Sequence, residues 1–110
     1  MQRYEQFTIY WCNLEPTFGQ QMQKTRPCVI VSPNEMNELL GTVIVVPLTS
    51  TVRKFPFYLP VLYNDRSGAL ACDQIKAIDK RRVGKCFAAL TKNDSIALST
   101  TLSSMFYVGA

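Results

Sequence analysis

Hydrophobic residues in this chain gather in short runs of strand length, separated by polar segments rich in proline, glycine and asparagine. Aromatic and β-branched residues dominate these runs, which favours strands over helices. The most apolar run, 42–48, is hydrophobic on both faces, so we expect it to be a central strand. Strands are predicted at 7–12, 28–32, 42–48, 61–63, 69–78 and 86–90.

Prolines and turn residues divide these strands. Pro27 is expected at the first position of its strand, where no ladder hydrogen bond is needed. Pro60 precedes the run 61–63 and indicates an edge strand or a bulged one. The segment 64–68 has the composition of a turn.

Helical patterns are confined to two places. One or two helical turns are predicted over 35–40. Near the C-terminus, Thr91 is placed to cap a helix in which apolar residues recur at helical spacing, namely Leu98, Leu102, Met105 and Phe106. Segregated strands followed by one C-terminal helix predict an α+β fold, a strongly curved, SH3-like antiparallel β-barrel.

Composition limits the chemistry. The 110 residues, 47% of them hydrophobic, suit a single domain spanning 1–110 with its own core. The sequence has no histidine, which removes the commonest general base and most transition-metal sites. The four cysteines are far apart, so we expect them to be free and buried, with no zinc site and no disulfides: Cys12, Cys28, Cys72 and Cys86. No metal or cofactor is expected. Neither a membrane span nor a signal peptide is recognisable, which predicts a cytoplasmic protein.

Charge points to an anionic partner. The net charge is +4 and the isoelectric point is near 9.0. One basic cluster, 79–85, is interpreted as a solvated connector. Arg26 stands at the entrance to the strand 28–32, where a planar guanidinium could bind a phosphate, or could simply be a solvated charge.

Several separate segments together resemble the MazF/PemK/Kid toxins, which are endoribonucleases of bacterial toxin–antitoxin modules. Their agreement in order and spacing is more specific than any single motif. The segments are Glu15-Pro16-Thr17 with Gly19, Arg26-Pro27, Val46-Pro47-Leu48-Thr49-Ser50, Asp73-Gln74-Ile75-Lys76, and Ile78-Asp79-Lys80 with Arg82.

The resemblance implies an SH3-like barrel that forms a homodimer and binds single-stranded RNA in a groove. It implies metal-free cleavage, in which the ribose 2′-hydroxyl attacks the adjacent phosphorus and leaves a cyclic phosphate and a 5′-hydroxyl. It also implies an antitoxin whose acidic, disordered tail folds along the groove.

By position, the resemblance assigns catalytic roles to Arg26, Thr49 and Asp73. Arg26 would stabilise the phosphorane, Thr49 would hold a phosphate oxygen, and Asp73 would act as general base. Each has a plainer alternative: Thr49 as a strand-end hydroxyl, and Asp73 as a structural acceptor or a partner for a nearby cation. The residues expected to bind RNA are Gln20, Gln21, Lys24, Thr25, Ser50, Thr51, Lys54, Gln74 and Lys76.

Two departures from the family pattern leave alternatives open. Many relatives carry an acidic or His-Glu pair at the positions of Gln20 and Gln21, whose amides cannot take a proton at pH 7. One branch carries an arginine where this chain has Ala71. Either Arg26, Thr49 and Asp73 suffice for cleavage, or the chain is a relative that binds without cutting. A third reading, a CcdB-like gyrase poison, lacks the Trp-Gly-Ile ending typical of those toxins, because this chain ends in Val-Gly-Ala.

Overall fold

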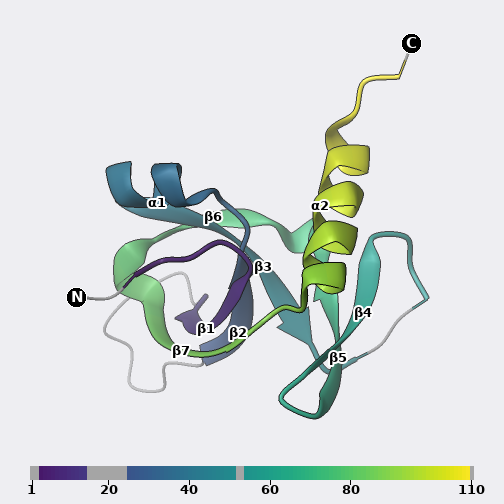
Figure 1. Ribbon diagram of the computed structural model, residues 1–110, viewed down its shortest axis with the longest axis horizontal. Coiled ribbons are helices and arrows are strands. Elements are labelled where there is room, and N and C mark those ends of the chain that lie inside the picture. The colour runs from purple at the N-terminus through teal and green to yellow at the C-terminus, as the bar shows by residue number, and fades with distance from the viewer. Residues whose placement is uncertain (1–2, 15–24, 52–53, 110) are drawn as a thin grey trace.

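The structure, a computed structural model, describes residues 3–14, 25–51 and 54–109 (Figure 1). Within these residues seven strands form one curled sheet in the order β4-β5-β3-β2-β1-β7, with β6 pairing to β3 off this path. The strands are β1 (Thr8–Asn13), β2 (Thr25–Ile30), β3 (Thr42–Thr49), β4 (Tyr58–Tyr63), β5 (Arg66–Ala71), β6 (Lys76–Asp79) and β7 (Val83–Ala89). The helices are α1 (Asn34–Leu39), α2 (Lys92–Phe106) and the short 3-10 turns η1 (Cys72–Gln74) and η2 (Lys80–Arg82). All strand pairs are antiparallel.

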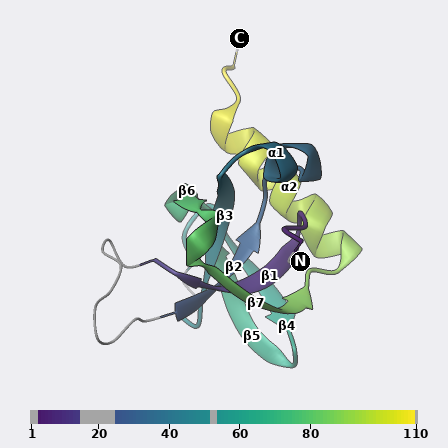
Figure 2. The same cartoon turned by 90° about the vertical axis from the view of Figure 1, so that its left-hand side faces the viewer.

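This architecture confirms the predicted α+β, SH3-like curved barrel with a C-terminal helix. Figures 1 and 2 both show α2 along one side of the curled sheet, with the C-terminus projecting away from it. The predicted cap is also present, because the Thr91 hydroxyl accepts a hydrogen bond from the Asp94 amide at 3.1 Å. No helix in the described part of the chain is long and apolar enough to cross a membrane.

Strand β3 is central, as its apolar pattern predicted. Residues 42–45 pair with β6, Val45 to Pro47 pair with β2, and Leu48 and Thr49 then pair with β5. The strand therefore passes from one part of the curled sheet to the other near Pro47. Its last residue, Thr49, is delivered to the junction between the two parts.

Side chains on the two faces of the sheet form two hydrophobic clusters. Neighbouring residues enter different clusters, as Val45 and Val46 do, because successive side chains point to opposite faces of a strand. Leu98 of α2 is fully buried in the cluster that contains Val46, so α2 closes that face. Burial of this apolar surface, at roughly 25 cal/mol per Å², holds a helix whose many serines and threonines favour it only weakly.

Several predicted boundaries were wrong. β2 begins at Thr25, so Pro27 lies inside the strand; it lies outside the stretch that pairs with β3, where a missing N–H is tolerated. The predicted strand 69–78 is two strands, β5 and β6, separated by η1. The turn at 64–68 is shorter than expected, because Asn64 and Asp65 both adopt positive φ angles (45° and 61°) and close a tight hairpin in which Tyr63 pairs with Arg66.

The last strand and one cysteine also differ from expectation. β7 starts at Val83 rather than at 86, so part of the basic segment 79–85 is strand and part is η2. Cys86 is exposed because it lies on β7, the edge strand of the sheet order, whereas Cys12, Cys28 and Cys72 are buried; all four are free thiols. β4 is an edge strand, as predicted, but it begins at Tyr58 rather than at 61 and so includes Pro60.

Candidate functional site

A groove of about 680 Å³ opens at one end of the curled sheet. The strand ends that meet there are the end of β1 with the start of β2, the end of β3, the start of β4, the end of β5 and the start of β6. The described residues that line it are Leu14, Arg26, Pro47, Leu48, Thr49, Thr51, Tyr58, Ala71, Gln74 and Lys76. The topology thus brings together three segments that the sequence analysis selected separately, around Arg26, Thr49 and Gln74.

Two cations dominate the electrostatics of the groove. Arg26 and Lys76 both line it and are exposed, and none of its described lining residues is acidic. Among the described residues, neither cation forms an ion pair within 4.0 Å. Two cations without an anion on a concave surface attract phosphate groups. The guanidinium of Arg26 adds a planar fork of donors that matches phosphate oxygens.

Thr49 supplies a hydroxyl beside these cations. Its Oγ1 accepts a hydrogen bond from the Thr51 amide at 3.1 Å, which leaves the hydroxyl proton available for donation to a ligand. Gly68 of β5 packs against this strand end: a Cβ at Gly68 would lie 3.1 Å from the Thr49 carbonyl oxygen and 3.0 Å from the Tyr63 ring. The absence of a side chain at Gly68 therefore sets how closely β5 approaches Thr49.

Asp73 lies beside the groove and does not line it. It belongs to η1, is exposed, and its Oδ2 accepts a hydrogen bond of 3.5 Å from the side-chain amide of Gln74, which does line the groove. It lies at the break between β5 and β6, inside the segment 69–78 that was predicted as one strand. In the described part of the chain Asp73 makes no ion pair with Lys76 or Arg82, so that structural alternative finds no support.

The predicted RNA-binding residues divide into three sets. Thr51, Gln74 and Lys76 line the groove. Thr25, Ser50 and Lys54 are exposed but do not line it. Gln20, Gln21 and Lys24, and with them the Glu15–Gly19 part of the family pattern, lie outside the described residues.

Sequence reasoning missed Tyr58 and the apolar floor of the groove. Tyr58 begins β4 and brings a phenol ring to the groove. The signal that could have found it is the concentration of aromatic residues between Pro56 and Pro60. Leu14, Pro47, Leu48 and Ala71 form the apolar lining, which composition alone does not distinguish from core.

Neither of two cysteines near the groove is activated as a nucleophile. Burial, aided by the negative charge of Asp73, raises the pKa of Cys72 to about 11. A hydrogen bond with Cys12, together with burial, raises the pKa of Cys28 well above its usual value. Both thiols are therefore neutral at pH 7. Within the described ranges no cluster of three or more His, Cys, Asp or Glu side chains is arranged to hold a metal ion.

The fold and the groove define a small curved β-barrel with a cationic, hydroxyl-bearing site suited to phosphate groups. Residues 5–106 match the family described as PemK-like, MazF-like toxin of type II toxin-antitoxin system. The chain belongs to this family.

Individual relatives agree with that assignment. The endoribonuclease toxin MazF of Escherichia coli (strain K12) is 32% identical over 76 residues, which cover 69% of this chain and 68% of that protein. The endoribonuclease PemK of Escherichia coli is 36% identical over 87 residues, covering 74% of this chain and 65% of that protein.

Solved structures show the same fold at lower identity. MazF (Form-I) from Deinococcus radiodurans superposes with a TM-score of 0.80 at 22% identity, covering 96% of this chain and 97% of that one. An endoribonuclease in complex with its cognate antitoxin, from a mycobacterial species, gives a TM-score of 0.79 at 23% identity, with the same coverage of 96% and 97%.

Proposed function

We propose that this protein is an endoribonuclease toxin that cleaves single-stranded RNA without a metal ion. The observation that carries the proposal is the groove in which Arg26, Lys76 and the Thr49 hydroxyl converge with no acidic lining residue among those described. The E. coli relatives MazF and PemK are both named endoribonucleases, which supports the same reaction class. A toxin that cleaves mRNA acts in the cytoplasm, which is where we place it.

The reaction is an internal transesterification. The ribose 2′-oxygen forms a bond to the adjacent phosphorus, the bond from phosphorus to the 5′-oxygen breaks, and the products are a 2′,3′-cyclic phosphate and a 5′-hydroxyl. Arg26 stabilises the charge on the phosphorane and on the leaving oxygen through hydrogen bonds, without giving up a proton. The 5′-oxygen takes its proton from water. Thr49 donates its hydroxyl proton to a non-bridging oxygen, which fixes the phosphate in line with the attack.

Asp73 is proposed to accept the proton of the 2′-hydroxyl. It is exposed beside the groove, and its hydrogen bond to Gln74 ties it to a lining residue. Because Asp73 does not itself line the groove, the bound ribose, rather than the phosphate, would have to approach it. Lys76 is assigned to a neighbouring phosphate, where a point charge suffices.

The proposed partners are a second copy of the chain and an antitoxin. The complex of MazE with MazF from Deinococcus radiodurans shows that one relative with this fold assembles with an antitoxin. We propose that the acidic, disordered tail of a cognate antitoxin occupies the cationic groove here, and that two protomers related by a two-fold axis extend the RNA groove. Light scattering at micromolar concentration should give a dimer, and a monomer would remove the two-protomer groove.

The decisive experiment incubates the pure protein with a long single-stranded RNA in the presence of EDTA. We expect discrete cleavage products with a 5′-hydroxyl and a cyclic phosphate, and no cleavage of a duplex, because in-line attack needs a nucleotide displaced from the helical stack. Loss of cleavage in EDTA, or products with a 3′-hydroxyl, would contradict the mechanism. Binding without cleavage of any RNA would identify a non-catalytic relative.

A further inference from the structure

The segment from Phe55 to Tyr58, which leads into β4, is a tight turn made largely of aromatic residues. The Tyr58 amide donates a hydrogen bond of 3.2 Å to the Phe55 carbonyl oxygen, with Pro56 at the second position of the turn. Phe57, at the third position, has a φ of 69°. These are the features of a type II turn, whose third position is normally glycine because φ is positive there.

Phe57 is locally unfavourable in this conformation. A bulky side chain in left-handed backbone is strained, and glycine would avoid the strain. Burial does not compensate, because Phe57 is 41% exposed and Phe55 is 54% exposed. This turn keeps a strained backbone at Phe57 and exposes two aromatic side chains. Contact of the turn with a ligand explains both, since such strain persists mainly at binding and catalytic sites.

The turn is held firmly against the groove. The Cys72 amide of η1 donates a hydrogen bond of 3.1 Å to the Phe57 carbonyl oxygen. The rings of Phe55 and Tyr58 meet edge to face, with centroids 5.7 Å apart and planes at 87°. Tyr58 lines the same groove as Arg26 and Thr49. The ring of Tyr58 therefore lies at the proposed phosphate site, with the Phe55 ring packed against it, and the backbone of Phe57 between them is fixed to η1.

We propose that the aromatic turn, Phe55 to Tyr58, is a stacking platform for an unpaired nucleobase next to the scissile phosphate. This inference rests on the proposed function of the groove as an RNA site. Aromatic faces bind any unstacked base, and here they adjoin the cation Lys54 as well as the groove cations. An acidic peptide tail fits the rings less well, because the face of an aromatic ring is negative and repels carboxylates.

The test uses a short single-stranded RNA that contains one mapped cleavage site, with 2-aminopurine at a flanking position to report stacking. Phe55→Ala and Phe57→Gly should each lower kcat/KM about tenfold, the range expected for loss of one base–aromatic contact. Phe55→Trp should retain activity because it restores a ring. Phe57→Gly should keep or raise Tm, because glycine relieves the backbone strain.

A double-mutant cycle identifies the partner base. Replacing the flanking nucleotide by an abasic one should slow the parent and abolish the difference between the parent and Phe57→Gly. The control is Leu62→Ala, since Leu62 is an exposed apolar residue of β4 (62%) outside the groove lining. It should cleave like the parent.

Three results would overturn the proposal. A large fall in Tm for Phe57→Gly would make the ring structural. Parent-like cleavage by both Phe55→Ala and Phe57→Gly would leave the platform without a role. If both variants cleaved RNA like the parent but were inhibited less by a cognate antitoxin, the turn would bind the antitoxin rather than a nucleobase. If the parent itself cuts no RNA, the proposed function fails separately, and a 2-aminopurine signal on binding that Phe57→Gly abolishes would still support the platform.

Discussion

Two hollows on this molecule contain similar residue types and differ in how those residues are used. The groove described above holds Arg26, Lys76, Gln74 and Tyr58. A second hollow of about 540 Å³ lies between the N-terminal segment, α1 and the start of η2, and is lined by Arg3, Tyr4, Glu5, Asn34, Asn37, Glu38 and Lys80. Each contains cations, an amide and a phenol, and only the second has acidic residues among its described lining residues.

In the second hollow most of the polar side chains already contact other groups of the protein. The buried Asn37 donates to the Tyr4 carbonyl oxygen at 2.8 Å and to the Ser32 carbonyl oxygen at 2.9 Å. Lys80 lies 5.0 Å above the Tyr4 ring, and Arg3 lies 3.9 Å from the Glu5 carboxylate. The hollow joins the N-terminal segment to α1.

In the groove the cations have no such partners among the described residues, and Thr49 keeps a free hydroxyl proton. The presence of cations, an amide and a phenol, together with cavity size, therefore does not distinguish a binding site from a structural joint. Whether the polar groups are already satisfied does distinguish them, because a group that has its partner gains little from a ligand.

Arg26→Ala should have the largest effect on cleavage, and it tests most directly whether the groove cations differ from those of the second hollow. We expect cleavage to fall by roughly 10²–10³-fold, as when one preorganised donor to a developing oxyanion is removed. The fold should be unaffected, because Arg26 is exposed. Arg26→Lys should also be poor, since the fork geometry is lost. Single-turnover cleavage and Tm are the measurements. The matched control is Lys80→Ala in the second hollow, and equal losses for both variants would refute the distinction.

Asp73→Asn tests whether an acid outside the groove lining takes part in the chemistry. Loss of a general base typically costs about 10²–10⁴-fold, and we expect the lower end here because Asp73 lies beside the groove. RNA affinity should change little, because the cations of the groove remain. Single-turnover rates set against binding constants separate the two effects. Cleavage at the parental rate would leave Asp73 only its hydrogen bond to Gln74.

Asn37→Ala should have the opposite effect: it should lower the free energy of unfolding and leave the cleavage rate unchanged. Besides its two donated hydrogen bonds, Asn37 accepts one from the Ser32 hydroxyl. Leaving such buried partners unsatisfied should cost about 2 kcal/mol or more of unfolding free energy. For a domain of this size the loss corresponds to a fall in Tm of roughly 8 °C. Gln74→Ala is the matched control, because this exposed amide of the groove should leave Tm unchanged. A reduced cleavage rate in folded Asn37→Ala would contradict the structural role.

How far the sequence predicts this molecule depends on the range of the interactions involved. The pattern of apolar residues correctly predicted β3 as central and α2 with its Thr91 cap, because periodicity and capping are local properties. Local composition could not show that Asn64 and Asp65 alone make the turn of a hairpin. It also could not show that β2 starts before Pro27, because that boundary depends on pairing with β1.

The candidate site shows the same division. Motif resemblance selected Arg26, Thr49, Gln74 and Lys76, and the topology places all four on one groove. It did not select Tyr58, because an aromatic residue in a β-rich sequence is more often core. It placed Asp73 in a strand, whereas η1 turns Asp73 out beside the groove. The positions of side chains around a cavity follow from long-range strand pairing, which short motifs do not encode.

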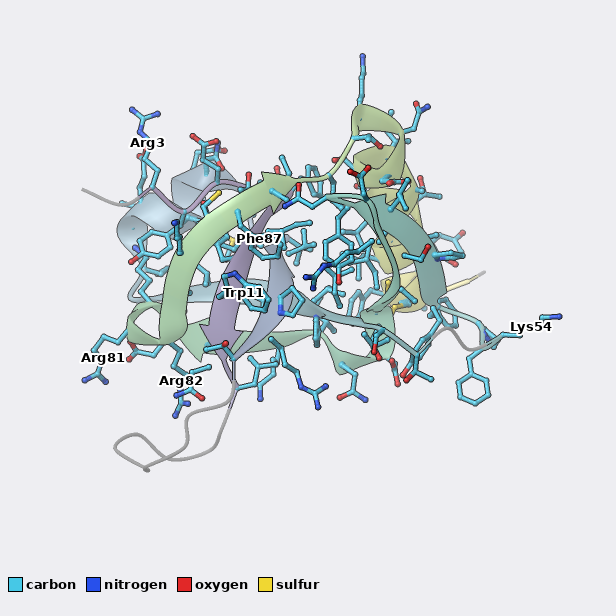
Figure 3. All side chains as sticks on the ribbon, turned by 90° about the horizontal axis from the view of Figure 1, so that it is seen from below. Arg3, Trp11, Lys54, Arg81, Arg82 and Phe87 are labelled. Atoms are coloured by element: carbon cyan, nitrogen blue, oxygen red, sulfur yellow. The ribbon has the colours of Figure 1, made fainter. Side chains whose placement is uncertain are left out.

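The smallest expected effect concerns the basic segment 79–85. Among the residues that the structure describes, its Arg81 already has a carboxylate partner, Asp79, unlike the cations of the groove. Asp79 accepts hydrogen bonds from the Arg81 side chain at 3.0 Å and from the Arg81 amide at 2.8 Å, and Figure 3 shows Arg81 and Arg82 far across the molecule from Lys54. The hydrogen bond from the Arg81 side chain lowers the pKa of Asp79 from 3.8 to about 2. A carboxylate whose pKa is lower in the folded state stabilises the fold above its unfolded pKa, and this contribution disappears as the pH falls through the folded value.

Asp79→Asn should therefore lower Tm slightly at pH 7, and the difference from the parent should shrink as the pH falls from 3.8 towards 2. The effect is small because both partners are exposed and water screens the pair. Asparagine keeps an oxygen that can cap η2, so the variant removes the charge and spares the cap. Paired thermal melts across this pH range provide the measurement, with RNA binding as the second readout. If Asp79→Asn bound RNA more tightly than the parent, the ion pair with Asp79 would be what prevents Arg81 from binding RNA. The segment 79–85 would then be part of the RNA-binding surface.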